Sequence, residues 1–183
     1  MKYSYPSWER ISRRVLVDTS FMRVYEDSLA LPNGNIIDDY TVVNMPNGVV
    51  IVATDCDGNL IVQYEYKYAI DKTILTLPSG GIDEGESTLV AAKRELLEET
   101  GYESDEIEVV RTLYEYPSKA DHLIYIIRAK NAKKITEATH EFTENISPVI
   151  LLSPNDKDYE GVFDTTYNVS AIALTLPNFL KKN

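Results

Sequence analysis

The 183-residue chain has little of three things: it contains one cysteine, few basic residues and no long apolar run. The single cysteine, Cys56, excludes an internal disulfide bond and is typical of a protein in a reducing compartment. The longest apolar run, residues 49–53, is far too short to span a bilayer, and residues 1–8 lack the apolar core of a signal peptide. We therefore expect a cytoplasmic protein that does not enter a membrane.

Basic residues are scarce relative to acidic ones. The chain has 18 Lys and Arg against 29 Asp and Glu, which gives a net charge of −11, and no basic run is longer than two residues. Such a surface repels polyanions, so the composition argues against nucleic acid or an anionic membrane as a partner. An anionic small molecule would have to be met by local cations or by a bound metal ion.

The stretch from Gly80 to Tyr102 is the most informative part of the sequence. It opens with a glycine pair and continues as a predicted helix, with Ser87 placed to cap its N-terminus and Gly101 placed to end it. A helical wheel separates an apolar side from an acidic side that Arg94 borders. We expect the apolar side to hold Leu89, Val90, Leu96, Leu97 and Thr100, the acidic side to hold Glu95, Glu98 and Glu99, and the small Ala91 and Ala92 to leave room for another group beside the acids.

The acidic side of this helix is a predicted metal site. Acidic faces are most often only solvated, but Glu95 stands three and four residues from Glu98 and Glu99, where like charges repel. At an effective dielectric of about 20, each such pair would cost on the order of 3 kcal/mol. A divalent cation would replace this repulsion with attraction, and Mg²⁺ prefers carboxylates together with water. The crowding therefore predicts a Mg²⁺ site.

The spacing within this stretch also resembles the signature of the Nudix hydrolases. The positions that match without a gap are Gly80, Glu86, Arg94, Glu95, Leu96, Glu98, Glu99, Gly101 and Tyr102. The resemblance implies hydrolysis of a nucleoside diphosphate linked to another group, with Mg²⁺ or Mn²⁺ as cofactor. It further implies that the metal is held by Glu95, Glu98, Glu99 and the backbone carbonyl of Ser79, with Glu86 joining through water and Arg94 orienting the carboxylates.

Further marks resemble the subgroup of the family that hydrolyses ADP-ribose. Pro117 stands sixteen residues after Gly101, where that subgroup carries a proline. The segments that also look like the subgroup are 31–34, 63–68 and 77–81. The likeness extends from about residue 10 to residue 176, so it covers most of the chain.

The chain departs from the subgroup in three places. Lys67 stands where arginine is common, Thr76 stands where glutamate is common, and residues 119–121 lack the usual Pro-Gly. A lysine offers a point charge in place of the flat guanidinium fork, so these departures leave the exact substrate open. The candidates for substrate binding are Lys67 and Pro117, with Tyr25, Tyr66 and Tyr68 as stacking partners for adenine, although a tyrosine more often packs in a core or an interface.

Alternating and β-branched segments predict an α/β fold. Residues 1–44 form an expected arm of antiparallel strands (15–17, 21–29 and 36–43), and residues 45–183 form the expected Nudix domain. In that domain, strands are predicted at 49–54, 60–66, 73–77, 107–116, 122–129 and 149–152, and 130–145 reads as a polar loop. A final helix is predicted at 165–176, with Val169, Ile172, Ala173 and Leu176 on one face. Strands between two helices predict an α/β/α sandwich around a mixed sheet, as in the Nudix fold.

A general base must come from outside the metal ligands. In the resembling subgroup it lies in a loop before the strand that precedes the last helices, which here is 139–145. Glu144 is the first candidate and Glu141 the second, with Glu98 as the base if neither serves.

The sequence thus predicts a metal-dependent hydrolase that converts ADP-ribose to AMP and ribose 5-phosphate. Other nucleotide-sugars, dinucleoside polyphosphates or nucleoside triphosphates remain alternative substrates, and a Nudix-fold sensor that binds ADP-ribose without cleaving it is the alternative from another class. We also expect a homodimer that forms through the arm, because apolar residues such as Phe21, Met22 and Leu29 need cover.

Overall fold

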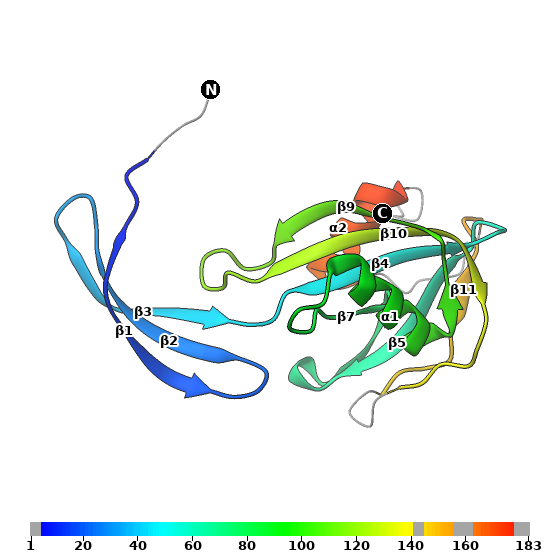
Figure 1. Ribbon diagram of the computed structural model, residues 1–183, viewed down its shortest axis with the longest axis horizontal. Coiled ribbons are helices and arrows are strands. Elements are labelled where there is room, and N and C mark those ends of the chain that lie inside the picture. The colour runs from blue at the N-terminus through cyan, green and yellow to red at the C-terminus, as the bar shows by residue number, and fades with distance from the viewer. Residues whose placement is uncertain (1–4, 141–144, 156–162, 178–183) are drawn as a thin grey trace. The chain divides into compact units, whose positions relative to one another are not determined.

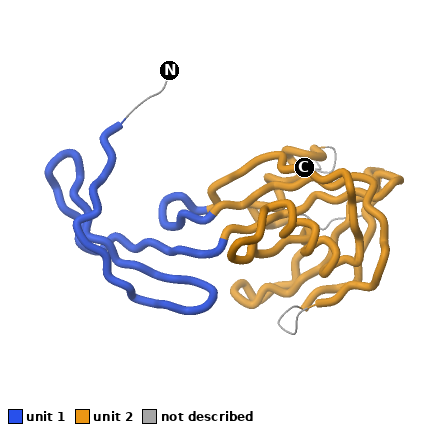
Figure 2. The backbone as a smooth tube through the Cα atoms, viewed as in Figure 1, with its two compact units in different colours: residues 1–46, 116–122 blue, residues 47–115, 123–183 orange. Residues whose placement is uncertain are grey.

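The computed structural model describes residues 5–140, 145–155 and 163–177. The chain divides into two compact units (Figure 2), one of residues 1–46 with 116–122 and one of residues 47–115 with 123–183. The first unit contains the expected arm. Residues 116–122 also belong to this unit, which no local pattern in the sequence indicates.

The first unit contains a three-stranded antiparallel sheet in the order β1-β2-β3 (Figure 1). Its strands are β1 (Glu9–Asp18), β2 (Arg23–Ala30) and β3 (Ile36–Asn44). The predicted arm of antiparallel strands is therefore confirmed. The strand that was expected from residue 21 begins at Arg23, because the Thr19 hydroxyl accepts the N–H groups of Phe21 and Met22 and turns the chain there.

The segment 116–122 is held by β3 within the first unit. The Val43 N–H donates to the Lys119 carbonyl at 2.7 Å, and the Tyr40 hydroxyl donates to the Ser118 carbonyl at 2.6 Å. The Lys119 ammonium also lies 3.9 Å from the centre of the Tyr40 ring, a cation–π distance. These contacts explain why a loop between two strands of the second unit belongs to the arm.

The second unit contains a mixed sheet. The order along its main path is β11-β5-β4-β10-β8, with β6 on β5, β7 on β4 and β9 on β10. The strands are β4 (Gly48–Asp55), β5 (Leu60–Lys67), β6 (Lys72–Thr76), β7 (Ser79–Gly81), β8 (Tyr102–Glu103), β9 (Glu106–Tyr114), β10 (Leu123–Lys134) and β11 (Ile150–Leu152), and a short 3-10 helix, η1, covers Tyr68–Ile70. β10 runs parallel to β4 and antiparallel to β9, which confirms the predicted mixed sheet.

The central strand β4 is buried on both faces, as its β-branched run indicates. Its alternate residues pack into two apolar clusters, one with α1 (Thr88–Thr100) and one with α2 (Thr166–Thr175) (Figure 1). The α1 cluster includes Val49, Ile51, Ala53, Ala91, Ala92 and Leu96, and the α2 cluster includes Val50, Val52, Ala171 and Ile172. A helix therefore covers each face of the sheet, as expected for the α/β/α sandwich.

Two stretches differ from the prediction. Residues 130–134, expected in a loop, continue β10, and their backbone pairs with β8 through Lys133 with Glu103 and Lys134 with Tyr102. The glycine pair Gly80-Gly81, for which no strand was predicted, lies with Ser79 in the short strand β7, which pairs with β4. Both strands form through backbone hydrogen bonds to a neighbouring strand. Their polar or glycine-containing sequences therefore show no strand pattern. No helix in the described part of the chain is both long and apolar enough to cross a membrane.

The predicted inner faces of both helices are partly wrong. In α1, Leu89 and Val90 are exposed, at 38% and 56%, and the side toward the sheet is formed instead by Ala91, Ala92, Glu95, Leu96, Glu99 and Thr100. Ala91 and Ala92 were expected to leave space for another group beside the acids. Instead they pack against the sheet, and their small size lets the helix approach it closely. In α2, the buried residues are Asn168, Ala171 and Ile172, whereas Val169 and Ala173 are exposed.

Helix α1 begins after Ser87 and ends at Gly101, as the sequence predicts. Ser87 occupies the N-cap position but its side chain makes no capping hydrogen bond. Gly101 ends the helix at φ +76°, and a Cβ there would lie 2.1 Å from the Thr136 carbonyl oxygen. Only glycine meets both demands.

Candidate active site

Arg94 on α1 is the centre of the acidic network. Its Nε and Nη2 donate to both oxygens of Glu86 at 3.0 Å, which is a bidentate pair. Its Nη1 donates to Glu95 at 2.7 Å and to Glu98 at 3.2 Å, and Nη2 also reaches the Gly81 carbonyl at 2.9 Å. One guanidinium therefore contacts three of the four predicted acidic metal ligands.

The charges of this network stabilise one another. The hydrogen bonds from Arg94, together with the Asp83 N–H, hold the pKa of Glu86 below its usual value. The Glu86 pair, followed by Glu95 and Glu98, raises the pKa of Arg94 further above its already high value. Arg94 therefore offsets the repulsion that the sequence predicts along α1, because it donates to three of the carboxylates.

Glu95 lies where the chain has no room for a side chain on Gly80. A Cβ on Gly80 would lie 2.0 Å from Glu95 Oε1, whereas a Cβ on Gly81 would meet nothing within 4 Å. The absence of a side chain at Gly80 thus creates the space for the Glu95 carboxylate, which is 8% exposed. The glycine pair is consequently asymmetric: the first is required by the glutamate and the second is not.

Glu99 is held from the opposite side by two N–H donors. Its Oε2 accepts the Gln63 Nε2–H from β5 and the Ser79 backbone N–H from β7, both at 3.0 Å. Ser79 had been predicted to contribute its carbonyl, and its N–H contact with Glu99 was not foreseen. Gln63 was missed altogether, although a polar residue after the apolar Leu60-Ile61-Val62 run was a visible signal.

The C-terminal end of α1 is capped by the segment before residue 141. The Thr139 N–H donates to the Glu98 carbonyl at 2.7 Å, and His140 Nε2 lies 3.1 Å from the Glu99 carbonyl. The general-base candidates Glu141 and Glu144 lie outside the described residues. On their other side, the Asn145 carbonyl accepts the Tyr66 N–H of β5 at 3.0 Å. Of the described residues next to these candidates, Thr139 and His140 therefore contact α1 and Asn145 contacts β5.

Behind the site, α2 is joined to the strand that leads to β7. The fully buried Asn168 donates its amide N–H to the Thr76 hydroxyl at 3.2 Å and accepts the Leu77 N–H at 3.3 Å. Thr76, which replaces a glutamate of the resembling subgroup, therefore has a structural partner in this chain. Sequence reasoning missed Asn168 because it expected an apolar inner face.

The predicted substrate-binding residues lie in both units. In the second unit, Lys67 pairs with Glu65 at 2.5 Å, the Tyr66 hydroxyl donates to Asp71 at 3.0 Å, and Tyr68 is 87% exposed. In the first unit, Arg13 lies 4.1 Å from the centre of the Tyr25 ring while it pairs with the buried Asp27, and Pro117 belongs to the segment on β3. Their grouping around a substrate stays a prediction.

The acidic residues of α1 fit a hard cation in their chemistry. All side chains of the predicted set offer carboxylate oxygens, which Mg²⁺ and Mn²⁺ favour, and Gly80 leaves the space that one of them occupies. Among the described residues, no three histidine, cysteine, aspartate or glutamate side chains form a group that could hold an ion. Instead, Glu86, Glu95 and Glu98 meet at Arg94. A bound cation would therefore share these carboxylates with the guanidinium.

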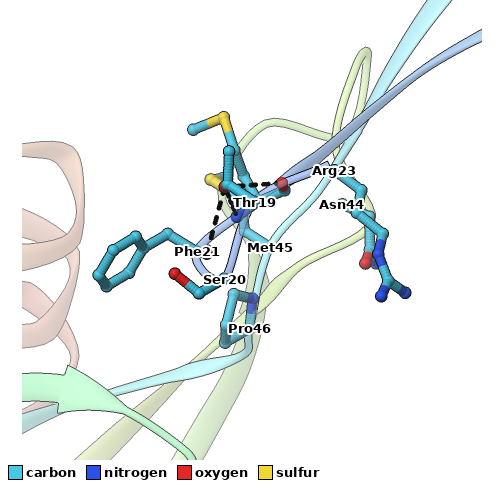
Figure 3. Close-up of a pocket in the computed structure, with 8 residues that line it drawn as sticks. Thr19, Ser20, Phe21, Arg23, Asn44, Met45 and Pro46 are labelled. Carbon is cyan, nitrogen blue, oxygen red and sulfur yellow. Dashed lines mark hydrogen bonds between the residues drawn. The ribbon is translucent and has the colours of Figure 1, made fainter. Parts of the chain in front are cut away.

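A separate hollow of about 310 Å³ lies within the first unit (Figure 3). Its lining residues are Thr19, Ser20, Phe21, Met22, Arg23, Asn44, Met45 and Pro46. None of the predicted site residues is among them, and the Thr19 hydroxyl is already bonded within the turn. We therefore do not assign catalytic chemistry to this hollow.

Two family models match the chain. Residues 45–162 match the family model of the NUDIX domain, and residues 8–43 match the model of the nucleoside diphosphate sugar hydrolase N-terminal domain. A crystal structure of an ADP compounds hydrolase superposes with a TM-score of 0.75 and 25% identity, over 94% of each chain.

Similar sequences include two ADP-ribose pyrophosphatases. The Bacillus subtilis protein is 26% identical over 127 residues, which is 69% of this chain and 68% of that protein, and the Mycobacterium tuberculosis protein is 30% identical over 137 residues, 73% and 66%. The methanol dehydrogenase activator of Bacillus methanolicus is 31% identical over 113 residues, 62% and 60%. The matched segments thus span between 60% and 68% of these relatives.

The fold and the site define a class of α/β proteins in which an acidic helix packs on a mixed sheet behind a glycine-containing strand. The NUDIX match covers more than half of the chain and includes every part of that arrangement. The chain belongs to the Nudix hydrolase family.

The contrast between Gly80 and Gly81 generates a prediction. Gly80→Ala should displace Glu95 from Arg94, lower the free energy of unfolding by about 1–3 kcal/mol and weaken Mn²⁺ binding, because the added Cβ overlaps the carboxylate. Gly81→Ala is the matched control and should change neither quantity substantially. Thermal unfolding and Mn²⁺ titration measure both, and equal effects of the two substitutions would contradict the role given to Gly80.

Proposed function

We propose that this protein hydrolyses the diphosphate bond of a nucleoside diphosphate-sugar, with ADP-ribose as substrate and AMP and ribose 5-phosphate as products. The observation that supports this most directly is the pairing of the NUDIX domain with an N-terminal domain of nucleoside diphosphate sugar hydrolases in one chain. Two relatives named ADP-ribose pyrophosphatase and an ADP compounds hydrolase structure favour adenosine among the nucleosides. The single exposed cysteine is compatible with action in the cytoplasm.

The residues that would hold Mg²⁺, or Mn²⁺ in its place, are Glu95, Glu98, Glu99 and the Ser79 carbonyl, with Glu86 acting through water. When bound, such an ion neutralises charge on the diphosphate and makes a coordinated water more acidic. Arg94 orients Glu86, Glu95 and Glu98 through charge-assisted hydrogen bonds. Gln63 and the Ser79 N–H hold Glu99. The reaction adds water across one P–O bond, so that one phosphoryl group keeps the adenosine and the other keeps the ribose.

Another nucleoside diphosphate-sugar is the second candidate substrate. Lys67, where the resembling subgroup commonly has arginine, is paired with Glu65 at 2.5 Å, and this pairing reduces the positive charge that it offers a diphosphate. Comparing kcat/KM for ADP-ribose and GDP-mannose on the same preparation distinguishes the two, since the proposal requires the larger value for ADP-ribose.

Activity should depend on the metal and on the acidic side of α1. Glu98→Gln and Glu99→Gln should each lower kcat for ADP-ribose by about 100-fold or more, because each removes a charge that acts on the transition state. Glu103→Gln changes an exposed glutamate of β8 and is the control. Chelation with EDTA should abolish turnover, and Mg²⁺ should restore it. Wild-type turnover in either α1 variant would disprove the proposed metal site.

Glu144 is the proposed general base, with Glu141 as the reserve. Glu144→Gln should lower kcat at neutral pH by roughly 10²–10⁴ while Mn²⁺ affinity stays near the wild-type value, because a base removes a proton without holding the ion. A collapse in Glu141→Gln with normal turnover in Glu144→Gln would move the role to Glu141. Normal turnover in both variants would assign the role to Glu98.

We also propose that the protein is a homodimer that forms through the first unit. All ten residues of β1 are exposed, and β1 is an edge strand whose second side has no partner within the described chain. The exposed apolar residues of this unit include Trp8, Ile11, Val15, Leu16, Val17, Phe21, Met22 and Ile36. Side chains of this kind on a three-stranded sheet need cover, and a second copy supplies it.

Light scattering tests the dimer. The wild-type protein should show twice the chain mass at micromolar concentration, and Val15→Glu with Val17→Glu should give monomers, because the added charges cannot be buried in the interface. Val109→Glu changes a similarly exposed valine of β9 in the second unit and should leave the dimer intact. A monomeric wild-type protein would refute the proposal.

A further inference from the structure

Gln63 is an unusual residue for its position in β5. The three residues before it, Leu60, Ile61 and Val62, are fully buried and apolar, and Gln63 is equally buried, at 0% exposure. A long amide side chain loses its hydration in such a place, and therefore needs partners for both its N–H group and its carbonyl.

Only one end of the Gln63 amide is satisfied. Nε2 donates to Glu99 Oε2 at 3.0 Å, whereas Oε1 is a buried oxygen without a hydrogen-bond partner in the described part of the chain. An apolar side chain of similar size would fill the same space without this cost. Burial of the Gln63 side chain is therefore unfavourable by itself. The hydrogen bond that its side chain makes is to Glu99.

The contact constrains Glu99 in a specific way. The terminal torsion of a glutamate is broad, so a carboxylate held by one donor can still turn. Glu99 Oε2 receives two donors from different elements, Gln63 on β5 and the backbone N–H of Ser79 on β7. Two donors from separate strands fix the plane of the carboxylate on α1.

We propose that Gln63 is a positioning residue that orients the Glu99 carboxylate for a divalent cation. The inference rests on the proposed function, which makes Glu99 a metal ligand, and adds the residue that prepares this ligand before the ion arrives. Ligands that are already oriented lose less freedom on binding, and removal of such a supporting hydrogen bond typically costs 10–100-fold in metal affinity.

The test is Mn²⁺ binding to the substrate-free protein, followed by electron paramagnetic resonance of the free ion. Gln63→Met removes both the N–H and the unpartnered carbonyl at similar volume. Its Kd for Mn²⁺ should rise by roughly 10–100-fold. Its melting temperature should change little, because the lost hydrogen bond to Glu99 is offset by the loss of the unpartnered carbonyl, and the Ser79 N–H still donates to Glu99. A residue with a merely structural role would give the reverse pattern, a lower melting temperature with an unchanged Kd.

A second variant and a control make the result specific. Gln63→Asn keeps an amide but shortens the side chain by one methylene, which withdraws the N–H from Glu99, so its Kd should rise in the same direction. Ile61→Val alters packing on the same face of β5 without touching a hydrogen bond, and its Kd should match the wild type.

The outcomes separate this inference from the proposed function. If the wild type binds Mn²⁺ and hydrolyses ADP-ribose but the Kd is unchanged or lower in Gln63→Met and Gln63→Asn, the role of Gln63 is overturned and the function stands. If the wild type does not bind Mn²⁺, the metal site and the role of Gln63 are both overturned.

Discussion

The site depends on one ion network, in which the Arg94 guanidinium offsets the charge of the glutamates around it. Glu86, Glu95 and Glu98 all pair with this one cation, which offsets their mutual repulsion. The bidentate pair with Glu86 also ties the turn before α1 to the middle of the helix. The same contacts therefore hold the turn before α1 and orient the glutamates.

Close packing of small residues makes the burial of acids tolerable. Ala91 and Ala92 bring α1 against β4, and Gly80 leaves the volume that the Glu95 carboxylate occupies. Buried carboxylates require donors, and the chain supplies them from Arg94, Gln63 and the Ser79 backbone. The inner side of α1 thus combines small or apolar residues with the paired acids Glu95 and Glu99, an arrangement that a helical wheel based on hydrophobicity could not recognise.

The sequence was informative wherever a pattern is local. The spacing from Gly80 to Tyr102, the strand buried on both faces at residues 49–53 and the turn at Gly101 all follow from short-range rules on helices, strands and glycine. It misled where backbone pairing decides structure, as in residues 130–134, whose polar side chains concealed a strand that pairs with β8. It was also silent on the return of residues 116–122 to the first unit.

By itself, therefore, the sequence determined the family and the acidic helix, because both follow from residues that are close together along the chain. Only the tertiary structure decided which groups donate hydrogen bonds to those acids. Gln63 meets Glu99 across 36 positions and Asn168 meets Leu77 across 91, and no periodicity links such pairs. The physical reason is that a hydrogen bond between buried groups depends on how strands and helices stack, which is settled by packing of the whole core rather than by any single segment.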